Sequence, residues 1–126
     1  IKNTEHLPNV IPINKALLDK PGLAHIKIGG VIPKLKPPDS CLPFNCEAVD
    51  LDSYGLKPGF IKLDVEGCET LVLTGATETM KSFPVVMVEE KGLWNGWSKF
   101  PPDEILRKLH YRQVEKMRPD YVWIHE

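Results

Sequence analysis

Four acidic residues close two apolar runs, and their placement is the strongest sign of chemistry in this sequence. Asp64 and Glu66 lie two positions apart at the end of one run, and Glu89 and Glu90 close the next. Alternate residues of a strand share a face, so Asp64 and Glu66 would project together. If the two runs form neighbouring parallel strands, all four acids meet at the carboxyl edge of a sheet, where open α/β sheets bind ligands. Acids gathered in a cleft indicate a partner, a metal or a reaction; the alternative is solvated acids at a sheet rim.

The elements that would position these acids alternate between strand and helix. Apolar runs predict strands at 46–51, 60–65 and 85–88, and the last is continuous enough to be buried on both faces. Helical spacing predicts a helix over 68–83, and a second helix begins at Pro102. Strands at 111–117 and 121–124 predict a closing hairpin. This order predicts an α/β fold, with residues 1–126 forming one domain around a mixed sheet.

Two glycine and proline signals refine this expectation. Residues 1–45 hold seven of the twelve prolines, which interrupt helices, so only short strands are expected there, at 10–16 and 24–28 around a Pro21-Gly22 turn. Gly75 falls inside the predicted helix, where glycine costs about 1 kcal/mol relative to alanine. We therefore expect another segment to pack closely against Gly75.

Composition excludes several classes of protein. The chain has 126 residues and a formal net charge of −1, which argues against a general nucleic-acid binder. No apolar run approaches the roughly 20 residues of a membrane span. An odd count of three cysteines without a CxxC pair predicts free thiols in a reducing, cytoplasmic compartment. A Cys41–Cys46 disulfide is the alternative.

The segment Ile61-Lys62-Leu63-Asp64-Val65-Glu66-Gly67-Cys68-Glu69, followed by Val72-Leu73-Thr74-Gly75-Ala76, resembles the central motif of the FkbM family of methyltransferases. That motif runs roughly I-K-[IL]-D-V-E-G-x-E, then V-L-x-G-A, then an apolar strand that ends in Glu, here Glu89. The resemblance implies a partial Rossmann-like methyltransferase fold. It also implies an enzyme that uses S-adenosylmethionine to methylate a hydroxyl of a sugar or small metabolite.

The resemblance also implies roles for individual residues. Asp64 and Glu66 would lie on the acceptor side of the cleft, with Glu89 as support, and would orient the acceptor hydroxyl or take its proton. Ala16 and Leu17 would border the adenine of the cofactor. Independently, Trp94 and Trp97 follow the acid cluster and could line an acceptor pocket, since ligand sites are rich in aromatic side chains. The alternative for these tryptophans is a packed loop that covers the sheet edge.

Two departures from the family pattern bear on these expectations. The family's D-x-G-A-x-x-G cofactor loop and the acid of its second strand have no counterpart here, so we expect the chain to be the C-terminal part of such an enzyme. The strand at 10–16 would then lack a neighbour, and the strand at 60–65 would expose an apolar edge. The second departure is His110 in place of the usual glycine; a left-handed histidine would cost roughly 1–2 kcal/mol, which predicts a different local helix end.

Three hypotheses about function follow. The first is an S-adenosylmethionine-dependent O-methyltransferase. The second is a non-catalytic module that binds a protein partner, or a second copy of itself, through the open edge. The third is an enzyme that holds magnesium or calcium on Asp64, Glu66 and Glu89, because hard cations prefer oxygen ligands. The retained acids favour the first hypothesis, and the absent glycine loop favours the second.

Overall fold

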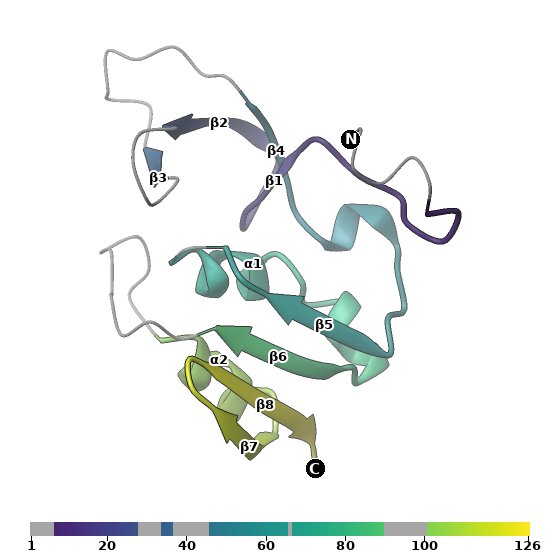
Figure 1. Cartoon of the computed structure of the whole chain (residues 1–126), viewed down its shortest axis with the longest axis vertical. Helices are drawn as coiled ribbons and strands as arrows, with labels where there is room; N and C mark the ends of the chain where they lie inside the picture. Colours follow the sequence, from purple (N-terminus) through teal and green to yellow (C-terminus); the bar gives the residue numbers. More distant parts are fainter. Residues whose placement is uncertain (1–6, 28–33, 37–45, 66, 90–100) are drawn as a thin grey trace.

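The computed structural model describes residues 7–27, 34–36, 46–65, 67–89 and 101–126, which form two four-stranded mixed sheets and few helices (Figure 1). One sheet has the order β1-β4-β2-β3. It comprises β1 (Ala16–Leu17), β2 (Gly22–Lys27), β3 (Lys34–Lys36) and β4 (Cys46–Val49). The other has the order β5-β6-β8-β7. It comprises β5 (Phe60–Leu63), β6 (Val85–Glu89), β7 (Tyr111–Met117) and β8 (Asp120–His125). The helices are α1 (Glu69–Thr74), α2 (Pro102–Lys108) and two 3₁₀ turns, Asp52–Tyr54 and Thr79–Ser82. The α/β class is therefore confirmed.

The second sheet carries the acidic strand ends. Its strands β5 and β6 run parallel with Leu63 opposite Val88, as expected for neighbours whose ends share an edge. Strand β8 is antiparallel to both β6 and β7 and lies between them. The closing hairpin is therefore confirmed, and β5 is an edge strand of the described sheet, as predicted.

One face of this sheet is buried against the two helices. Leu63, Val86, Val88 and Trp123 pack with Leu73 and Leu106 in the main core, and each of these side chains is at most 3% exposed. Along β6 the burial alternates, and Val85, Met87 and Glu89 are only half-buried. The prediction that this strand is buried on both faces was therefore wrong, because α1 and α2 both cover the same face.

The long helix predicted at 68–83 is broken in two. Helix α1 ends at Thr74, and a 3₁₀ turn follows at Thr79–Ser82. A Cβ atom on Gly75 would overlap the Leu18 carbonyl oxygen and lie 2.9 Å from the Asp50 Cβ atom. The close neighbour expected at Gly75 is therefore confirmed, and it comes from the loops that follow β1 and β4.

The N-terminal strand is shorter than predicted, and it does have a neighbour. Only Ala16 and Leu17 form β1, which pairs in parallel with Ala48 and Val49 of β4. Strand β2 begins at Gly22 and pairs antiparallel with β4. The expectation of a strand without a partner was wrong because these segments form a separate sheet.

The end of α2 also corrects the sequence analysis. His110 adopts the left-handed conformation with φ 61°, so the histidine takes the backbone geometry that glycine would favour. The His110 amide donates to the Arg107 carbonyl at 3.1 Å, and the Glu126 amide donates to the His110 carbonyl at 2.9 Å. These two bonds hold the left-handed cap in place, and the prediction of a different local helix end was wrong. Among the described helices, none has the length and apolar character needed to cross a membrane.

Candidate functional site

Asp64 and Glu89 lie at the same edge of the second sheet. Asp64 directly follows β5 and Glu89 ends β6, and the pairing of Leu63 with Val88 places the two acids next to one another. Asp64 is exposed, and Glu89 is half-buried. Glu66, the third predicted acid, and Glu90 lie outside the described residues. The structure therefore brings together two of the three predicted catalytic acids.

A third acid, Asp120, joins this edge from β8, opposite Glu89 in the antiparallel register. Asp120 is not among the predicted site residues, because the sequence pattern places it in the hairpin turn. Lys62 Nζ lies 3.8 Å from an Asp64 oxygen and 3.7 Å from an Asp120 oxygen. We call Lys62, Asp64, Glu89 and Asp120 the acidic edge. Its one lysine stands against three carboxylates, so its formal charge is negative.

Lys62 lies near the carboxylates of Asp64 and Asp120 but is too far from either for a hydrogen bond. Distances of 3.7 and 3.8 Å exceed those of a hydrogen bond. The Asp120 Oδ1 atom is shielded from solvent and has no hydrogen-bond partner among the described residues. Half-exposed ion pairs of this kind contribute little to stability. The exposed Asp64 carboxylate therefore remains able to accept a hydrogen bond from a hydroxyl or a cationic group.

The turn between β5 and α1 is fixed by Glu69. Its Oε1 atom accepts hydrogen bonds from the Val65 amide at 3.1 Å and the Gly67 amide at 3.2 Å. Gly67 has φ 99°, a conformation that favours glycine. Glu69 is 7% exposed and its described contacts serve the loop. Glu69 therefore positions the end of β5, next to Asp64.

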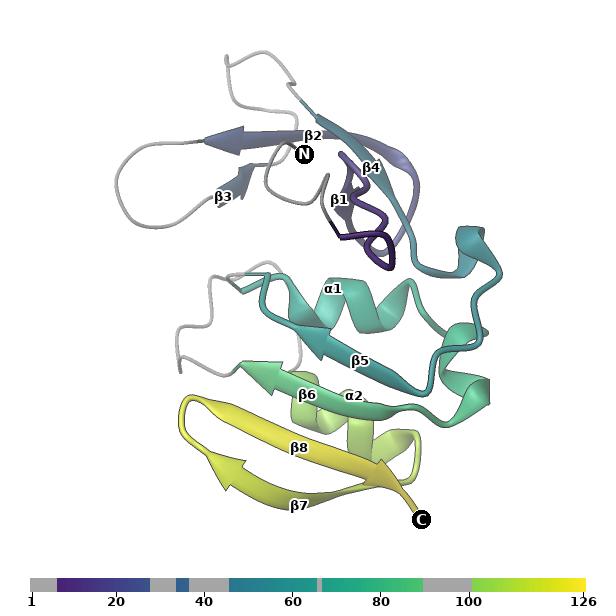
Figure 2. The same ribbon diagram turned by 45° about the vertical axis from the view of Figure 1, so that its right-hand side comes forward.

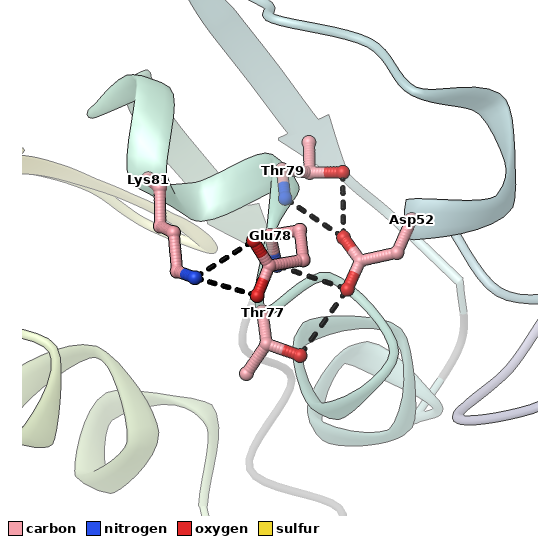
Figure 3. Close-up of polar contacts among 5 residues, drawn as sticks. All are labelled: Asp52, Thr77, Glu78, Thr79 and Lys81. Atoms are coloured by element: carbon pink, nitrogen blue, oxygen red, sulfur yellow. Dashed lines mark hydrogen bonds and ion pairs between the residues drawn. The ribbon is translucent and has the colours of Figure 1, made fainter.

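Asp52 is a second polar centre, and it is structural (Figure 3). Its carboxylate accepts hydrogen bonds from the amides of Glu78 and Thr79 at 2.9 and 2.7 Å. The hydroxyls of Thr77 and Thr79 donate to it at 3.2 and 2.8 Å. Partial burial raises the pKa of Asp52, but the hydrogen bonds together outweigh this and hold it below its ordinary 3.8. Asp52 thus caps the 3₁₀ turn that follows α1.

The two residues expected to border a cofactor, Ala16 and Leu17, both pack against other residues of the chain. Ala16 is 8% exposed and lies in a small buried cluster with Ala24 and Ala48. Leu17 packs against the main core. Both belong to the first sheet, whereas Asp64 and Glu89 belong to the second. Trp94 and Trp97, expected to line an acceptor pocket, lie outside the described residues. The cofactor and acceptor assignments remain predictions.

The described residues include free cysteines but no cluster of metal-binding side chains. No group of three or more histidine, cysteine or acidic side chains could hold a metal ion within the described ranges, which omit Glu66. Cys46 and Cys68 are free thiols. Burial raises the pKa of Cys68 to about 11, and the neighbouring Glu69 adds to this rise. Cys68 is therefore a protonated core residue at neutral pH.

In comparisons with known proteins, no protein family, curated protein or solved structure matches the chain.

Proposed function

We propose that this chain forms the acceptor side of an S-adenosylmethionine-dependent O-methyltransferase that acts on a hydroxyl of a sugar or small metabolite. The observation that carries the proposal is the parallel register that sets Asp64 beside Glu89. The closing hairpin and the mixed sheet also agree with the partial methyltransferase fold that the resemblance implies. The sequence motif is the basis for the chemical class, and the meeting of Asp64 and Glu89 at one sheet edge supports an acceptor site there.

The acidic edge suits a neutral hydroxyl acceptor. An exposed Asp64 carboxylate can accept the hydroxyl hydrogen bond, orient the oxygen and take its proton as the oxygen loses it. Lys62 lies 3.8 Å from Asp64 and places a positive charge beside this carboxylate. The carboxylates of Asp64 and Asp120, which share one lysine, disfavour an anionic acceptor.

The two residues expected to border the cofactor, Ala16 and Leu17, are both packed against other residues. Ala16 is buried beneath its neighbours in the first sheet, and Leu17 packs on the main core. Neither presents a free surface on which an adenine ring could lie. The proposal therefore assigns to this chain only the binding of the acceptor and the handling of its proton.

The test is methyl transfer by the native polypeptide that contains this sequence. Methyl-labelled S-adenosylmethionine is offered with neutral, cationic and anionic sugars, and label in the sugar is measured. We expect transfer to neutral or cationic sugars, with Asp64→Asn lowering kcat about 100-fold, within the range for loss of a general base. Asp103→Asn, in the first turn of α2 and outside the acidic edge, is the matched control and should leave the rate unchanged. Equal activity of Asp64→Asn and the parent would contradict the assignment.

A partner-binding module is the second candidate function, and the free edge of β5 favours it. Among the described strands, β5 pairs only with β6, and its first residue Phe60 is 56% exposed. Exposed apolar edges invite pairing with another chain. Light scattering across a concentration series tests self-pairing: a dimer that Phe60→Lys dissociates would support this function. A monomer at every concentration would count against self-pairing.

A further inference from the structure

Glu69 is a buried acid whose hydrogen bonds lead out of its own helix. It occupies the first turn of α1 and is 7% exposed. Its Oε1 atom accepts the amide hydrogens of Val65 and Gly67, at 3.1 and 3.2 Å, and both of these residues precede the helix. Figure 2 shows the chain reversing between the end of β5 and α1, which brings the first turn of α1 back to the end of that strand. We call these two hydrogen bonds the Glu69 bridge.

An interaction with the helix dipole does not account for this arrangement. An acid in the first turn favours a helix from a partly exposed position, as Glu104 does in α2, where its carboxylate lies 2.8 Å from Lys108. Burial of a carboxylate is unfavourable unless hydrogen bonds replace the water that it loses. The Glu69 bridge supplies such bonds, and both of them fix the turn before the helix.

The Glu69 bridge fixes the residue that follows Asp64. The Val65 amide donates to Glu69, and the Val65 carbonyl accepts the Cys68 amide hydrogen at 3.4 Å. The Val65 side chain packs against the main core. On the other side of Asp64, Leu63 belongs to β5 and is 3% exposed in the same core. The backbone of Asp64 therefore lies between two fixed neighbours.

Among the described contacts, none of comparable length orients the Asp64 side chain. Lys62 lies 3.8 Å from its carboxylate, which is too far for a hydrogen bond, and the two side chains are 47% and 43% exposed. The placement of the Asp64 carboxylate therefore depends on its backbone, and so on the turn that Glu69 holds.

We propose that Glu69 is a positioning residue of the acceptor site, which acts through the backbone of Val65 to hold the Asp64 carboxylate against the acceptor hydroxyl. This inference rests on the proposed function, because it uses the role that Asp64 has there. A reacting group that shifts by about 1 Å can lose about 100-fold in rate. Loss of the Glu69 bridge should therefore slow methyl transfer, although Glu69 itself is buried.

The first measurement is amide hydrogen exchange in the native polypeptide that contains this sequence, followed by NMR. We expect Glu69→Ala to speed exchange at Val65 and Gly67 by about tenfold or more, while the amides of β6, which is paired on both sides, keep their rates. Glu69→Gln retains an oxygen acceptor and should stay within about threefold of the parent. Unchanged exchange at Val65 and Gly67 in Glu69→Ala would overturn the inference. Equal acceleration in β6 would also overturn it, because the whole fold would then be opening.

The second measurement is methyl transfer to a neutral sugar by the same variants. We expect Glu69→Ala to lower kcat about 100-fold with KM within about threefold, and Glu69→Gln to keep most of the parent rate. Glu104→Ala, which changes an acid in the first turn of α2, is the matched control and should leave kcat unchanged. The double variant Asp64→Asn with Glu69→Ala should be no slower than Asp64→Asn alone, because Glu69 acts through Asp64.

The outcomes separate this inference from the proposed function. Additive losses in the double variant would mean that Glu69 acts independently of Asp64, and would overturn its positioning role while the methyltransferase stands. A parent polypeptide that transfers no methyl group would overturn the proposed function, and the role of Glu69 in it, even where the exchange rates show the Glu69 bridge.

Discussion

Replacement of Asp52 tests how the 3₁₀ turn Thr79–Ser82, which follows α1, is held in place. This carboxylate accepts four hydrogen bonds from residues 77–79, and the Asp52 amide itself donates to the Gly75 carbonyl at 3.1 Å. Asp52→Ala removes the side-chain acceptors and leaves the amides of Glu78 and Thr79 without their partner. We expect the 3₁₀ turn to lose its cap and Thr79, which is 2% exposed, to lose its hydrogen-bond acceptor.

The size of the effect follows from the bonds that are lost. Loss of a capping side chain costs about 0.5–2 kcal/mol, and a hydrogen bond to a charged group contributes about 1.5–3 kcal/mol. Because the Asp52 carboxylate is half-exposed, water replaces part of the hydrogen bonding that is lost. We therefore expect Asp52→Ala to lower the free energy of unfolding by about 2 kcal/mol. Asp52→Asn keeps one oxygen as an acceptor, and we expect a loss of about 1 kcal/mol.

Urea denaturation followed by circular dichroism measures both variants. With a typical slope of about 2 kcal/mol per molar urea, Asp52→Ala should lower the midpoint by about 1 M. Asp19→Asn is the matched control, because it changes an exposed aspartate in a nearby loop. The reasoning is refuted if the Asp52→Ala midpoint shifts no more than that of the control.

The same carboxylate makes stability depend on pH. Its folded pKa is lowered, because the hydrogen bonds outweigh the effect of burial. The unfolded chain therefore binds a proton at this carboxyl more readily than the folded chain does. The contribution of Asp52 is present above about pH 4, the ordinary range of an unfolded aspartate, and is lost as the pH falls through the folded pKa. The difference between the parent and Asp52→Asn should accordingly shrink as the solution is acidified.

Three further predictions concern the core. Gly75→Ala should lower the free energy of unfolding by about 2–3 kcal/mol, because the added Cβ overlaps the Leu18 carbonyl; a change below 0.5 kcal/mol in thermal unfolding would contradict that close approach. Cys68, with a pKa of about 11 and 4% exposure, should react with a thiol reagent at pH 8 only in urea, and rapid native labelling at Cys68, mapped by mass spectrometry, would contradict its burial. Burial raises the pKa of Tyr111 to about 12 and its hydroxyl has no described partner, so its contribution to stability is present below about pH 10 and lost as the pH rises through 12. Tyr111→Phe should therefore reduce this alkaline loss in urea titrations, and an unchanged alkaline loss would contradict it.

Local sequence patterns predicted much of the second sheet. Apolar runs at 60–65 and 85–88, and the two runs around Arg118-Pro119-Asp120, correspond to β5, β6, β7 and β8, because strand spacing and turn residues act over short distances. The helix predicted at 68–83 was too long. Its apolar periodicity continues through Gly75, whereas the contacts at Gly75, where α1 ends, come from Leu18 and Asp50. Those contacts depend on tertiary packing that periodicity does not contain.

The candidate site was predicted in part for the same reason. Asp64 and Glu89 could be placed together, because the ends of neighbouring parallel strands share an edge. Asp120 joins them only through the register of β8, and Lys62 lies among them only because alternate residues of β5 face outward. The role of Asp52 was hidden as well, since its partners lie 25–27 residues further along the chain.

Equilibrium binding of labelled S-adenosylmethionine to the native polypeptide that contains this sequence tests the central proposal most directly. Dialysis against the labelled cofactor, with and without excess unlabelled S-adenosylhomocysteine, measures specific binding. The proposed function requires one displaceable cofactor per polypeptide at micromolar to submillimolar concentrations. No displaceable binding at 1 mM would contradict the methyltransferase proposal and leave the partner-binding function as the better account of the open edge of β5.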